Sequence, residues 1–427
     1  MKVLIVGGGG REHAIALKIK ENPEVTALYA APGNGGIAQI ATCLPFKATD
    51  VDGIVRWAAE NKVDFVIVAP DDPLCLGMVD ALAEQGIPAF GPRKNAAIIE
   101  GSKVFSKNLM KKYGIPTAAY ETFDDYDEAV KYLQTADMPL VVKADGLALG
   151  KGVLICPDRE SAVEAVASMM KEAKFGASGA RVVIEEFLTG PEVSVLAFTD
   201  GKTVKPMVSS MDHKRALDHD EGLNTGGMGT IAPNPCYTPE LARRCMDEIF
   251  LPTIAAMNAE GRTFTGCLYF GLMMTPKGPK VIEYNCRFGD PETQVVLPLL
   301  KSDLLTIMRA TVDGTLADTP VEFASGAACC VVLASGGYPV SYKSGYPISG
   351  LDEAGKTATV FHAGTKLIDG QIVTAGGRVL GVTATANTLE AAIDKAYQAA
   401  DKITFTDMHM RRDIGQRALA SRKESHS

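Results

Sequence analysis

The sequence lacks the features that would place the chain in a membrane, in a disulfide-bonded secreted class or on a nucleic acid. No apolar run is long enough to cross a bilayer, and the apolar start, residues 1–6, breaks at Gly7, too short for a signal peptide. The nine cysteines are odd in number and none are spaced Cys-x-x-Cys, which favours reduced thiols. A net charge of -8 argues against a nucleic-acid scaffold. We therefore expect a cytoplasmic protein that binds neither membranes nor nucleic acids.

Several familiar catalytic and cofactor motifs are also missing. The six histidines have no metal-ligand spacing, and no Gly-x-Ser-x-Gly elbow is present. The glycines 7–10 suggest a dinucleotide fingerprint, but Glu12 or His13 stands where its third glycine belongs. This argues against a nicotinamide oxidoreductase. What remains is a turn of backbone amides before a helix, which favours a phosphate monoester, with Arg11 adding charge.

With 427 residues the chain is too long for one core, and its pattern predicts an α/β protein of several domains. Residues 1–101 alternate strands and helices, which is typical of a parallel sheet; one helix is expected from an N-cap at Asp72 to Gly86. Residues 102–324 contain two hairpins and a unit at about 117–190, and a long helix that Pro252 should kink. Residues 325–427 form a mixed α/β domain.

The segment Val281–Glu292 carries the strongest chemical signal. If it is a strand, Glu283, Asn285 and Arg287 share one face, because side chains alternate along a strand. A carboxylate beside an amide oxygen suits Mg²⁺, and the arginine can clamp a phosphate or carboxylate. An amphipathic strand with a solvated polar face is the alternative.

Two further segments are rich in glycine and charge. Residues 143–152 form a glycine-spaced turn flanked by Lys143 and Lys151, which favours a phosphate although the spacing is not that of a Walker A loop. A plain flexible hairpin is the alternative. Residues 210–215 and 224–230 are long and polar, and such a loop is either functional or disordered.

Together these segments resemble the phosphoribosylamine–glycine ligase family of the ATP-grasp superfamily, from Val3 to about Leu419. The matching motifs are Val6–His13, Ala69–Leu74, Gly101–Lys103, Lys143–Gly152, Asp212–Arg215, Asn224–Gly229 and Glu283–Gln294. The resemblance implies a central ATP-grasp domain of two α+β subdomains, with residues 117–190 as a lid. It also implies that ATP phosphorylates glycine and that the amine of 5-phosphoribosylamine then attacks the glycyl phosphate, giving glycinamide ribonucleotide.

The resemblance also assigns roles to single residues. ATP would contact Lys103, Lys143, Gly146, Gly150, Lys151, Gly152, Glu185, Glu186, Phe187, Leu188 and Glu192. Glu283 and Asn285 would hold Mg²⁺ or Mn²⁺, and Arg287 would orient the acyl phosphate or the glycine carboxylate. Asp212, Lys214 and Asp290 would surround glycine. The phosphoribosylamine side would comprise Gly9, Arg11, Asp71, Asp72, Pro73, Leu74, Asn224, Thr225, Gly226 and Gly227, with Glu12 and His13 bracing the turn.

Some alternatives stay open at this point. Another ATP-grasp carboxylate–amine ligase, or a biotin-carboxylase-like enzyme, would use the same nucleotide site with a different acceptor. A regulator without turnover has no physical need for Lys143, Glu283, Asn285 and Arg287 together. The strand at 268–274 has no carboxylate, so the number of metal ions is undetermined. Contact with other purine-pathway enzymes is a further expectation of the resemblance.

Overall fold

The computed structural model describes residues 1–147, 152–172 and 174–424. The N-terminal part contains a five-stranded parallel sheet in the order β3-β2-β1-β4-β5, as the alternating pattern predicts. Its elements are β1 (Lys2–Gly7), α1 (Gly10–Lys20), β2 (Ala27–Pro32), β3 (Thr42–Cys43), α2 (Val51–Glu60), β4 (Phe65–Val68) and β5 (Ala89–Phe90). Because all five strands are parallel, the glycine turn after β1 and the segment after β4 lie at the same edge.

The helix expected to begin after Asp72 and end at Gly86 is wrong in its bounds. Two helices are present instead, α3 (Asp71–Cys75) and α4 (Met78–Glu84). Pro70 occupies the N-cap of α3, so Asp71 and Asp72 lie inside the first turn. Gly77, at φ 89°, separates the two helices, because a left-handed residue ends the helical hydrogen-bond pattern.

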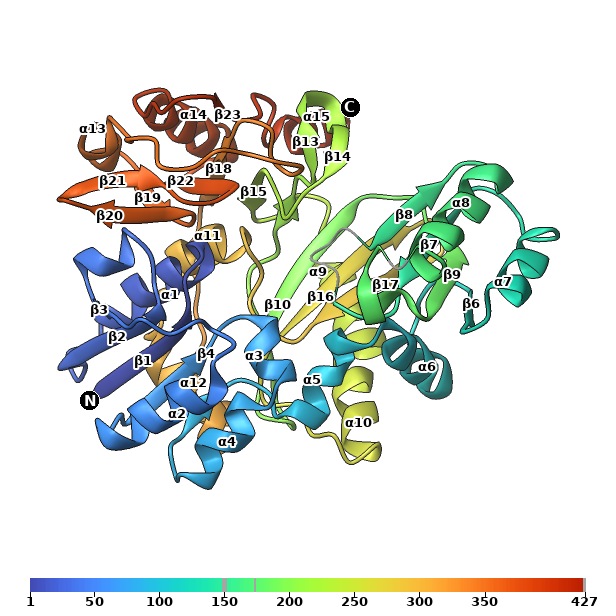
Figure 1. Ribbon diagram of the computed structural model, residues 1–427, viewed down its shortest axis with the longest axis horizontal. Coiled ribbons are helices and arrows are strands. Elements are labelled where there is room, and N and C mark those ends of the chain that lie inside the picture. The colour runs from blue at the N-terminus through green and yellow to red at the C-terminus, as the bar shows by residue number, and fades with distance from the viewer. Residues whose placement is uncertain (148–151, 173, 425–427) are drawn as a thin grey trace.

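Residues near the predicted lid form a separate antiparallel sheet, at the right of Figure 1, in the order β6-β9-β7-β8. Its elements are β6 (Tyr120–Phe123), α7 (Tyr126–Leu133), β7 (Leu140–Ala144), β8 (Val153–Cys156), α8 (Arg159–Met170) and β9 (Val182–Glu186). Leu133, Val142 and Val166 belong to a buried cluster whose members all come from this sheet and its two helices. The unit therefore has its own hydrophobic core.

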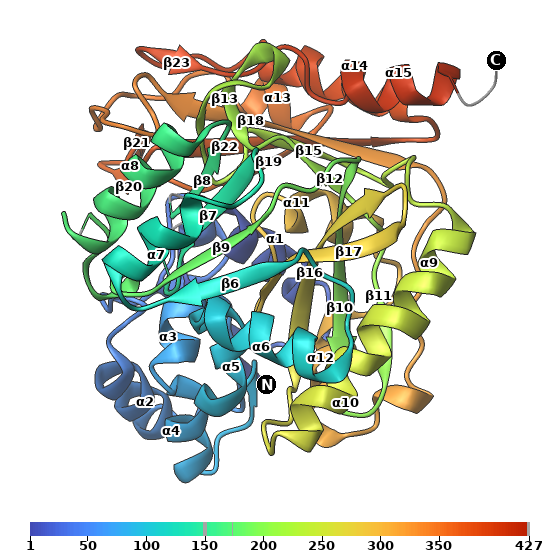
Figure 2. The same ribbon diagram turned by 90° about the vertical axis from the view of Figure 1, so that its right-hand side faces the viewer.

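A second antiparallel sheet, in the order β11-β10-β16-β17, forms the floor beneath the lid. It contains β10 (Glu192–Thr199), β11 (Val204–Pro206), β16 (Gly266–Thr275) and β17 (Gly278–Asn285), with α5 (Lys94–Gly101), α6 (Lys103–Tyr113), α9 (Pro239–Cys245) and α10 (Leu251–Ala259) nearby. Figure 2 shows α9 and α10 alongside this sheet. Both hairpins form as predicted, and the helical run around Pro252 contains a π-helical segment at Met246–Phe250.

The C-terminal part is built on the sheet β12-β15-β18-β22-β19, with β23 also paired to β18. Its elements include β12 (Met211–Asp212), β15 (Gly229–Ala232), β18 (Ala327–Ser335), β19 (Thr359–His362), β22 (Arg378–Ala386), β23 (Met408–His409), α13 (Leu351–Gly355), α14 (Leu389–Ala400) and α15 (Gln416–Glu424). Two hairpins flank it, β13 (Arg215–Leu217) with β14 (Glu221–Asn224) and β20 (Thr365–Ile368) with β21 (Gln371–Thr374). The strands β12 and β15 come from the middle of the chain, so the segment after residue 210 joins this sheet.

The units share buried surfaces. The segments α11 (Thr293–Val296) and α12 (Leu304–Asp313) follow β17, and Leu305 and Met308 of α12 lie in one buried cluster with Ile5 and Phe65 of the N-terminal sheet. Phe90 of the N-terminal sheet packs with Phe198 of β10 and with Phe288, which follows β17; the ring centroids are 5.8–6.3 Å apart. No helix in the described part of the chain is long and apolar enough to span a bilayer. The boundaries 1–101, 102–324 and 325–427 stay a prediction.

Candidate functional site

Strand β17 presents its polar residues on one face, as the alternating pattern predicts. It pairs antiparallel with β16, and Glu283 stands opposite Gly271. Tyr284 and Cys286 are buried, whereas the side chain of Glu283 is 32% exposed. The apolar face of β17 therefore fixes the strand in the core, and Glu283, Asn285 and Arg287 are left for chemistry.

Basic side chains surround the Glu283 carboxylate. Lys214 Nζ lies 4.0 Å from Glu283 Oε1 and 3.2 Å from Glu192 Oε2. Burial alone would raise the pKa of Glu283, but Lys214, Lys143 and Lys103 together hold it below the usual range. The same carboxylates, Glu192 first, raise the pKa of Lys214 well above its ordinary value. Glu283 is therefore ionised and Lys214 is charged at neutral pH.

A buried cluster of two lysines and one glutamate lies at the junction of the lid and the floor. Glu185 bonds Lys143 through one carboxylate oxygen and Lys107 Nζ, at 2.6 Å, through the other. Lys143 also donates to the Ile282 carbonyl at 3.2 Å, and Lys107 to Thr117 Oγ1 at 2.7 Å. Burial would raise the pKa of Glu185, yet the two lysines lower it overall, while burial lowers the pKa of Lys107 to about 8. Lys143 is thus held beside β17.

The glycine turn after β7 is anchored by Asp145. Its carboxylate accepts from the Ser102 hydroxyl and the Val104 amide, both at 2.8 Å, and from Arg181 Nη2 at 2.6 Å. Lys103 Nζ donates to the Gly146 carbonyl at 3.0 Å. These bonds tie the N-terminus of α6 to the start of the turn. The predicted ATP-binding residues Gly150 and Lys151 lie outside the described residues, whereas Gly146 and Gly152 lie within them.

The segment expected to read the adenine base follows β9 at the edge of the lid. Glu186 is exposed, and its backbone donates to the Ala119 carbonyl at 2.8 Å. Phe187 and Leu188 are half-buried and lie in no regular element, and Glu192 begins β10. Glu185, in contrast, is occupied by Lys107 and Lys143. The geometry therefore supports a role of the Glu185 side chain in charge pairing rather than in a direct contact with the base.

The turn between β1 and α1 is braced from within the protein. Glu12 accepts from the Gly9 amide and from Arg11 Nε, each at 2.7 Å, so its side chain satisfies the amide of the N-cap residue. Arg11 also donates to the Phe288 carbonyl at 3.1 Å, and its backbone amide donates to Asp290 Oδ2 at 3.1 Å. His13 Nδ1 accepts from the His362 amide at 2.7 Å. Glu12 and His13 thus brace the turn, and Arg11 connects it to the segment after β17.

The polar segments around 212 and 225 are ordered and lie beside Asp290. Thr225 Oγ1 accepts from the Gly227 amide at 2.9 Å and donates to the Lys214 carbonyl at 2.8 Å. Arg378, from β22, donates to the carbonyls of Gly226 at 2.7 Å and Asp290 at 2.9 Å. These bonds argue against disorder of the two loops, and their role in binding stays a prediction. Asn224 is the last residue of β14 and pairs with Arg215 of β13.

Two carboxyl groups near these loops influence each other electrostatically: Asp212, which is half-buried, and Glu292, which is buried. Burial, and then the neighbouring Glu292 carboxylate, raises the pKa of Asp212 well above its usual range. Burial also raises the pKa of Glu292. Like charges that interact in this way favour a nearby cation such as an ammonium group.

The predicted acceptor-side residues of α3 lie at the edge shared with the glycine turn. Burial raises the pKa of Asp72, and the neighbouring charge of Asp71 raises it further. Pro73 and Leu74 are buried. Asp71 also contributes to the raised pKa of Arg287, so α3 and the end of β17 are close enough to interact.

Sequence reasoning missed Glu100, Lys107, Glu292 and Arg378, which support the predicted residues. Their partners are distant in the chain, and spacing carries no signal for them. Glu100 alone has a local signal, because it follows the apolar run Ala96–Ile99 on a helix and so predicts a buried charge.

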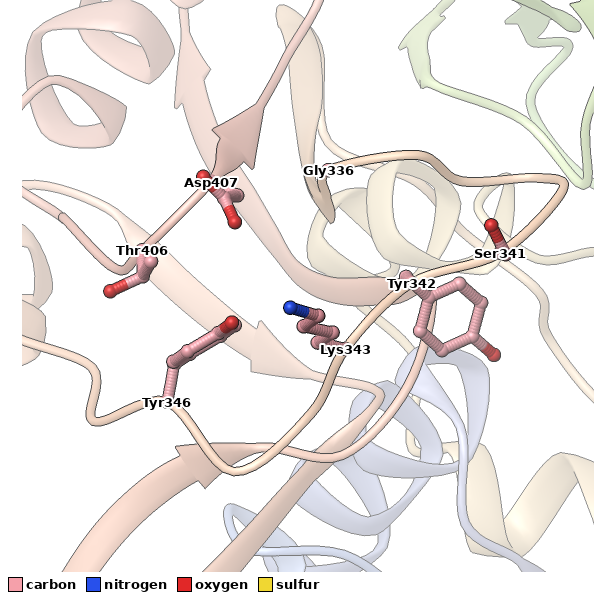
Figure 3. Close-up of a pocket in the computed structure, with 7 residues that line it drawn as sticks. All are labelled: Gly336, Ser341, Tyr342, Lys343, Tyr346, Thr406 and Asp407. Carbon is pink, nitrogen blue, oxygen red and sulfur yellow. The ribbon is translucent and has the colours of Figure 1, made fainter.

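Two hollows in the described part of the chain have none of the predicted residues in their lining. One of about 410 Å³ lies in the C-terminal part, where Lys343 points between Tyr346 and Asp407 (Figure 3). Lys343 is an exposed side chain on a loop. None of the residues that line this hollow belongs to the lid or to β17.

Comparisons with known proteins agree along the whole chain. Residues 1–100, 101–293 and 328–417 match the N domain, the ATP-grasp (A) domain and the C domain of phosphoribosylglycinamide synthetase. The phosphoribosylamine–glycine ligases of Halalkalibacterium halodurans and Allochromatium vinosum are each 49% identical, covering 100% and 98% of this chain and 99% of each relative.

Solved structures give the same result for the fold. The phosphoribosylamine–glycine ligase of Thermotoga maritima is 35% identical, with a TM-score of 0.86 over 97% of this chain and all of that one. A biotin carboxylase from Campylobacter jejuni is 15% identical, with a TM-score of 0.75 over 96% of this chain and 92% of its own. The second likeness concerns the fold alone.

Replacing Glu185 with glutamine should strongly destabilise the protein, because it leaves Lys107 and Lys143 buried without a counter-charge. We expect Glu185→Gln to lower the free energy of unfolding by about 3–5 kcal/mol. Glu186→Gln is the control, since Glu186 is exposed and lies 3.4 Å from Lys280, and should cost less than about 1 kcal/mol. Urea unfolding followed by circular dichroism measures both; equal losses would contradict the assignment.

Proposed function

The chain belongs to the phosphoribosylamine–glycine ligase family, and from this premise we propose that the cleft between the lid and β17 joins glycine to 5-phosphoribosylamine at the expense of ATP. The observation that carries the proposal is the shared face of Glu283, Asn285 and Arg287, with Lys214 within 4.0 Å of the carboxylate. Glu283 and Asn285 offer oxygen ligands for a metal cation, and Arg287 and Lys214 offer positive charge for phosphate groups. The likeness to biotin carboxylase is too low in identity to favour that activity.

The oxygen donors fit a divalent cation, Mg²⁺ or Mn²⁺. Glu283 remains ionised, and Asn285 offers a neutral amide oxygen two residues further on. Among the described residues no group of three or more His, Cys, Asp or Glu side chains could hold a metal. Phosphate and water oxygens would complete the shell, as is usual for Mg²⁺. When bound, the cation neutralises charge on the phosphate oxygens of ATP.

The first step of the proposed reaction transfers the γ-phosphoryl group. A carboxylate oxygen of glycine attacks the γ-phosphorus, the bond to the β-phosphate oxygen breaks, and ADP leaves. Lys103 and Lys143 hold the phosphates, and Arg287 holds the glycine carboxylate in line. Catalysis of this kind depends on positioning and charge stabilisation more than on covalent chemistry by the protein.

The second step forms the amide. The amine of 5-phosphoribosylamine attacks the carbonyl carbon of glycyl phosphate, phosphate leaves, and the nitrogen loses a proton. Gly9, Arg11 and the α3 turn would hold the ribose 5-phosphate, while Asp212 would interact with the amino group of glycine. The lid would exclude water, which otherwise hydrolyses the acyl phosphate. A cytoplasmic location and contact with other purine-pathway enzymes belong to the same proposal.

The substrate requirement tests this function directly. ADP release should need glycine and 5-phosphoribosylamine together, because the acyl phosphate is discharged only by the amine. A coupled assay with phosphoribosylamine generated from ribose 5-phosphate and ammonia measures it, with alanine, serine and aspartate in place of glycine as controls. ADP release that is indifferent to glycine would contradict the proposal.

A second test addresses the cation. Glu283→Gln keeps the shape but removes the charge, and we expect kcat to fall at least about 100-fold while the apparent metal requirement rises. The midpoint of thermal unfolding should change little, because Glu283 is partly exposed. The control Glu248→Gln alters an exposed pair with Arg244, which packs against the first residue of β17, Gly278, rather than against Glu283, and should leave turnover unchanged. Near-normal turnover by Glu283→Gln would refute the metal assignment.

A further inference from the structure

Glu100 is a buried carboxylate directly beneath the end of β17. It lies in the last turn of α5, and its side chain is only 6% exposed. Burial raises the pKa of Glu100, and the Arg287 guanidinium opposes that rise. A charge so far from water is costly unless several groups bond to it, so its partners indicate its role.

The carboxylate contacts three consecutive residues at the end of β17. Oε2 accepts from the Cys286 amide at 2.7 Å, and Oε1 accepts from Arg287 Nη2 at 2.9 Å. The Asn285 amide is satisfied in the orientation in which Nδ2 donates to Glu100 Oε1 at 2.9 Å and to the Tyr284 carbonyl at 3.2 Å. All three partners are donors, which suits an ionised carboxylate that can only accept.

The contact with Asn285 decides which end of its amide is available to a ligand. Because Nδ2 is bonded to Glu100 and to the Tyr284 carbonyl, Oδ1 is the end left for a cation. A reversed amide would turn two N–H groups toward the cation, and Mg²⁺ accepts oxygen ligands. Glu100 thus determines the orientation of the Asn285 amide.

The contact with Arg287 fixes the guanidinium in the same way. Nη2 is bonded to Glu100, and Nη1 donates to the Phe288 carbonyl at 3.3 Å. Nε is buried and has no hydrogen-bond partner within the described residues. A buried donor that the protein does not satisfy is costly, so this N–H is available to a bound anion.

We propose that Glu100 is a positioning residue, which turns the Asn285 oxygen toward the cation and holds Arg287 for the substrate anion. The inference rests on the proposed roles of Asn285 and Arg287. Glu100 itself acts through these two side chains and touches neither substrate nor cation.

The test exchanges the carboxylate at position 100 and the amide at position 285, first singly and then together, so that the hydrogen-bond donor and acceptor change places. In Glu100→Gln one of the two acceptor oxygens becomes an N–H group, so either the Cys286 amide or the Asn285–Arg287 pair loses its acceptor. The end of β17 is then held less firmly, and Mn²⁺ should bind about 10–100-fold more weakly. Asn285→Asp should also weaken binding, despite its added negative charge, because the new carboxylate faces that of Glu100. In the double variant the new amide at position 100 can donate to the new carboxylate at position 285, and affinity should recover at least about tenfold over Glu100→Gln.

Equilibrium binding provides the readout, independent of turnover. Electron paramagnetic resonance measures free Mn²⁺ with the β,γ-imido analogue of ATP present, and thermal unfolding confirms that each variant is folded. Asp413→Asn is the control, because it breaks a carboxylate–arginine pair elsewhere in the chain, with the buried Arg411, both bonds being 2.8 Å. This control should lose stability without weaker Mn²⁺ binding.

The possible outcomes separate this inference from the proposed function. If Glu283→Gln leaves Mn²⁺ binding unchanged, the cation site on β17 itself is wrong. If Glu283→Gln weakens binding but Asn285→Asp strengthens it, or the double variant shows no recovery, the role of Glu100 is overturned. Should Glu100→Gln fail to fold, Asn285→Asp alone tests the role of Glu100: weaker Mn²⁺ binding supports it, and stronger binding overturns it.

Discussion

The antiparallel pairing of β17 with β16 is the constraint on which the site depends. The register places Phe270 opposite Tyr284, and both side chains are buried in the core. The Tyr284 hydroxyl bonds Thr253 Oγ1 of α10 at 2.8 Å. Because side chains alternate, burying this face leaves the other for Glu283, Asn285 and Arg287. A shift by one residue would exchange the faces and remove the site.

Charge compensation is the second constraint, because the proposed reaction needs several cations close together. Three of the cations have a carboxylate partner among the described residues: Lys143 pairs with Glu185, Lys214 with Glu192, and Arg287 with Glu100. Arg378 similarly lies 3.6 Å from Asp290. These partners keep the basic groups charged and fixed in a partly buried cleft, so little reorganisation is needed when anionic substrates bind.

Local patterns in the sequence predicted much of the fold. Alternation predicted β17, Ser102 and Gly114 predicted the two ends of α6, and the glycines after β1 predicted a turn before a helix. The helix expected after Asp72 is in error because Gly77, which divides it, reads locally as a tolerated helix residue. Such features follow from neighbouring residues, which is why sequence alone reveals them.

The side chains that hold the site residues in place could not be predicted from local sequence patterns. Glu100 reaches residues 285–287, Arg378 reaches Gly226 and Asp290, and His13 reaches His362. These partners are far apart in the chain and are brought together only by the arrangement of the units. The joining of β12 and β15 to the C-terminal sheet has the same cause. The resemblance supplied candidate roles, but not the contacts that hold the residues in place.

The central claim is that this cleft brings the carboxylate of glycine to the γ-phosphorus of ATP. The most direct measurement follows the oxygen atoms, using glycine labelled with ¹⁸O in both carboxylate positions and ³¹P nuclear magnetic resonance of the phosphate released. The account predicts one ¹⁸O in each phosphate, because the oxygen that attacks phosphorus leaves with it when the amide forms. Phosphate that carries no label would contradict the account.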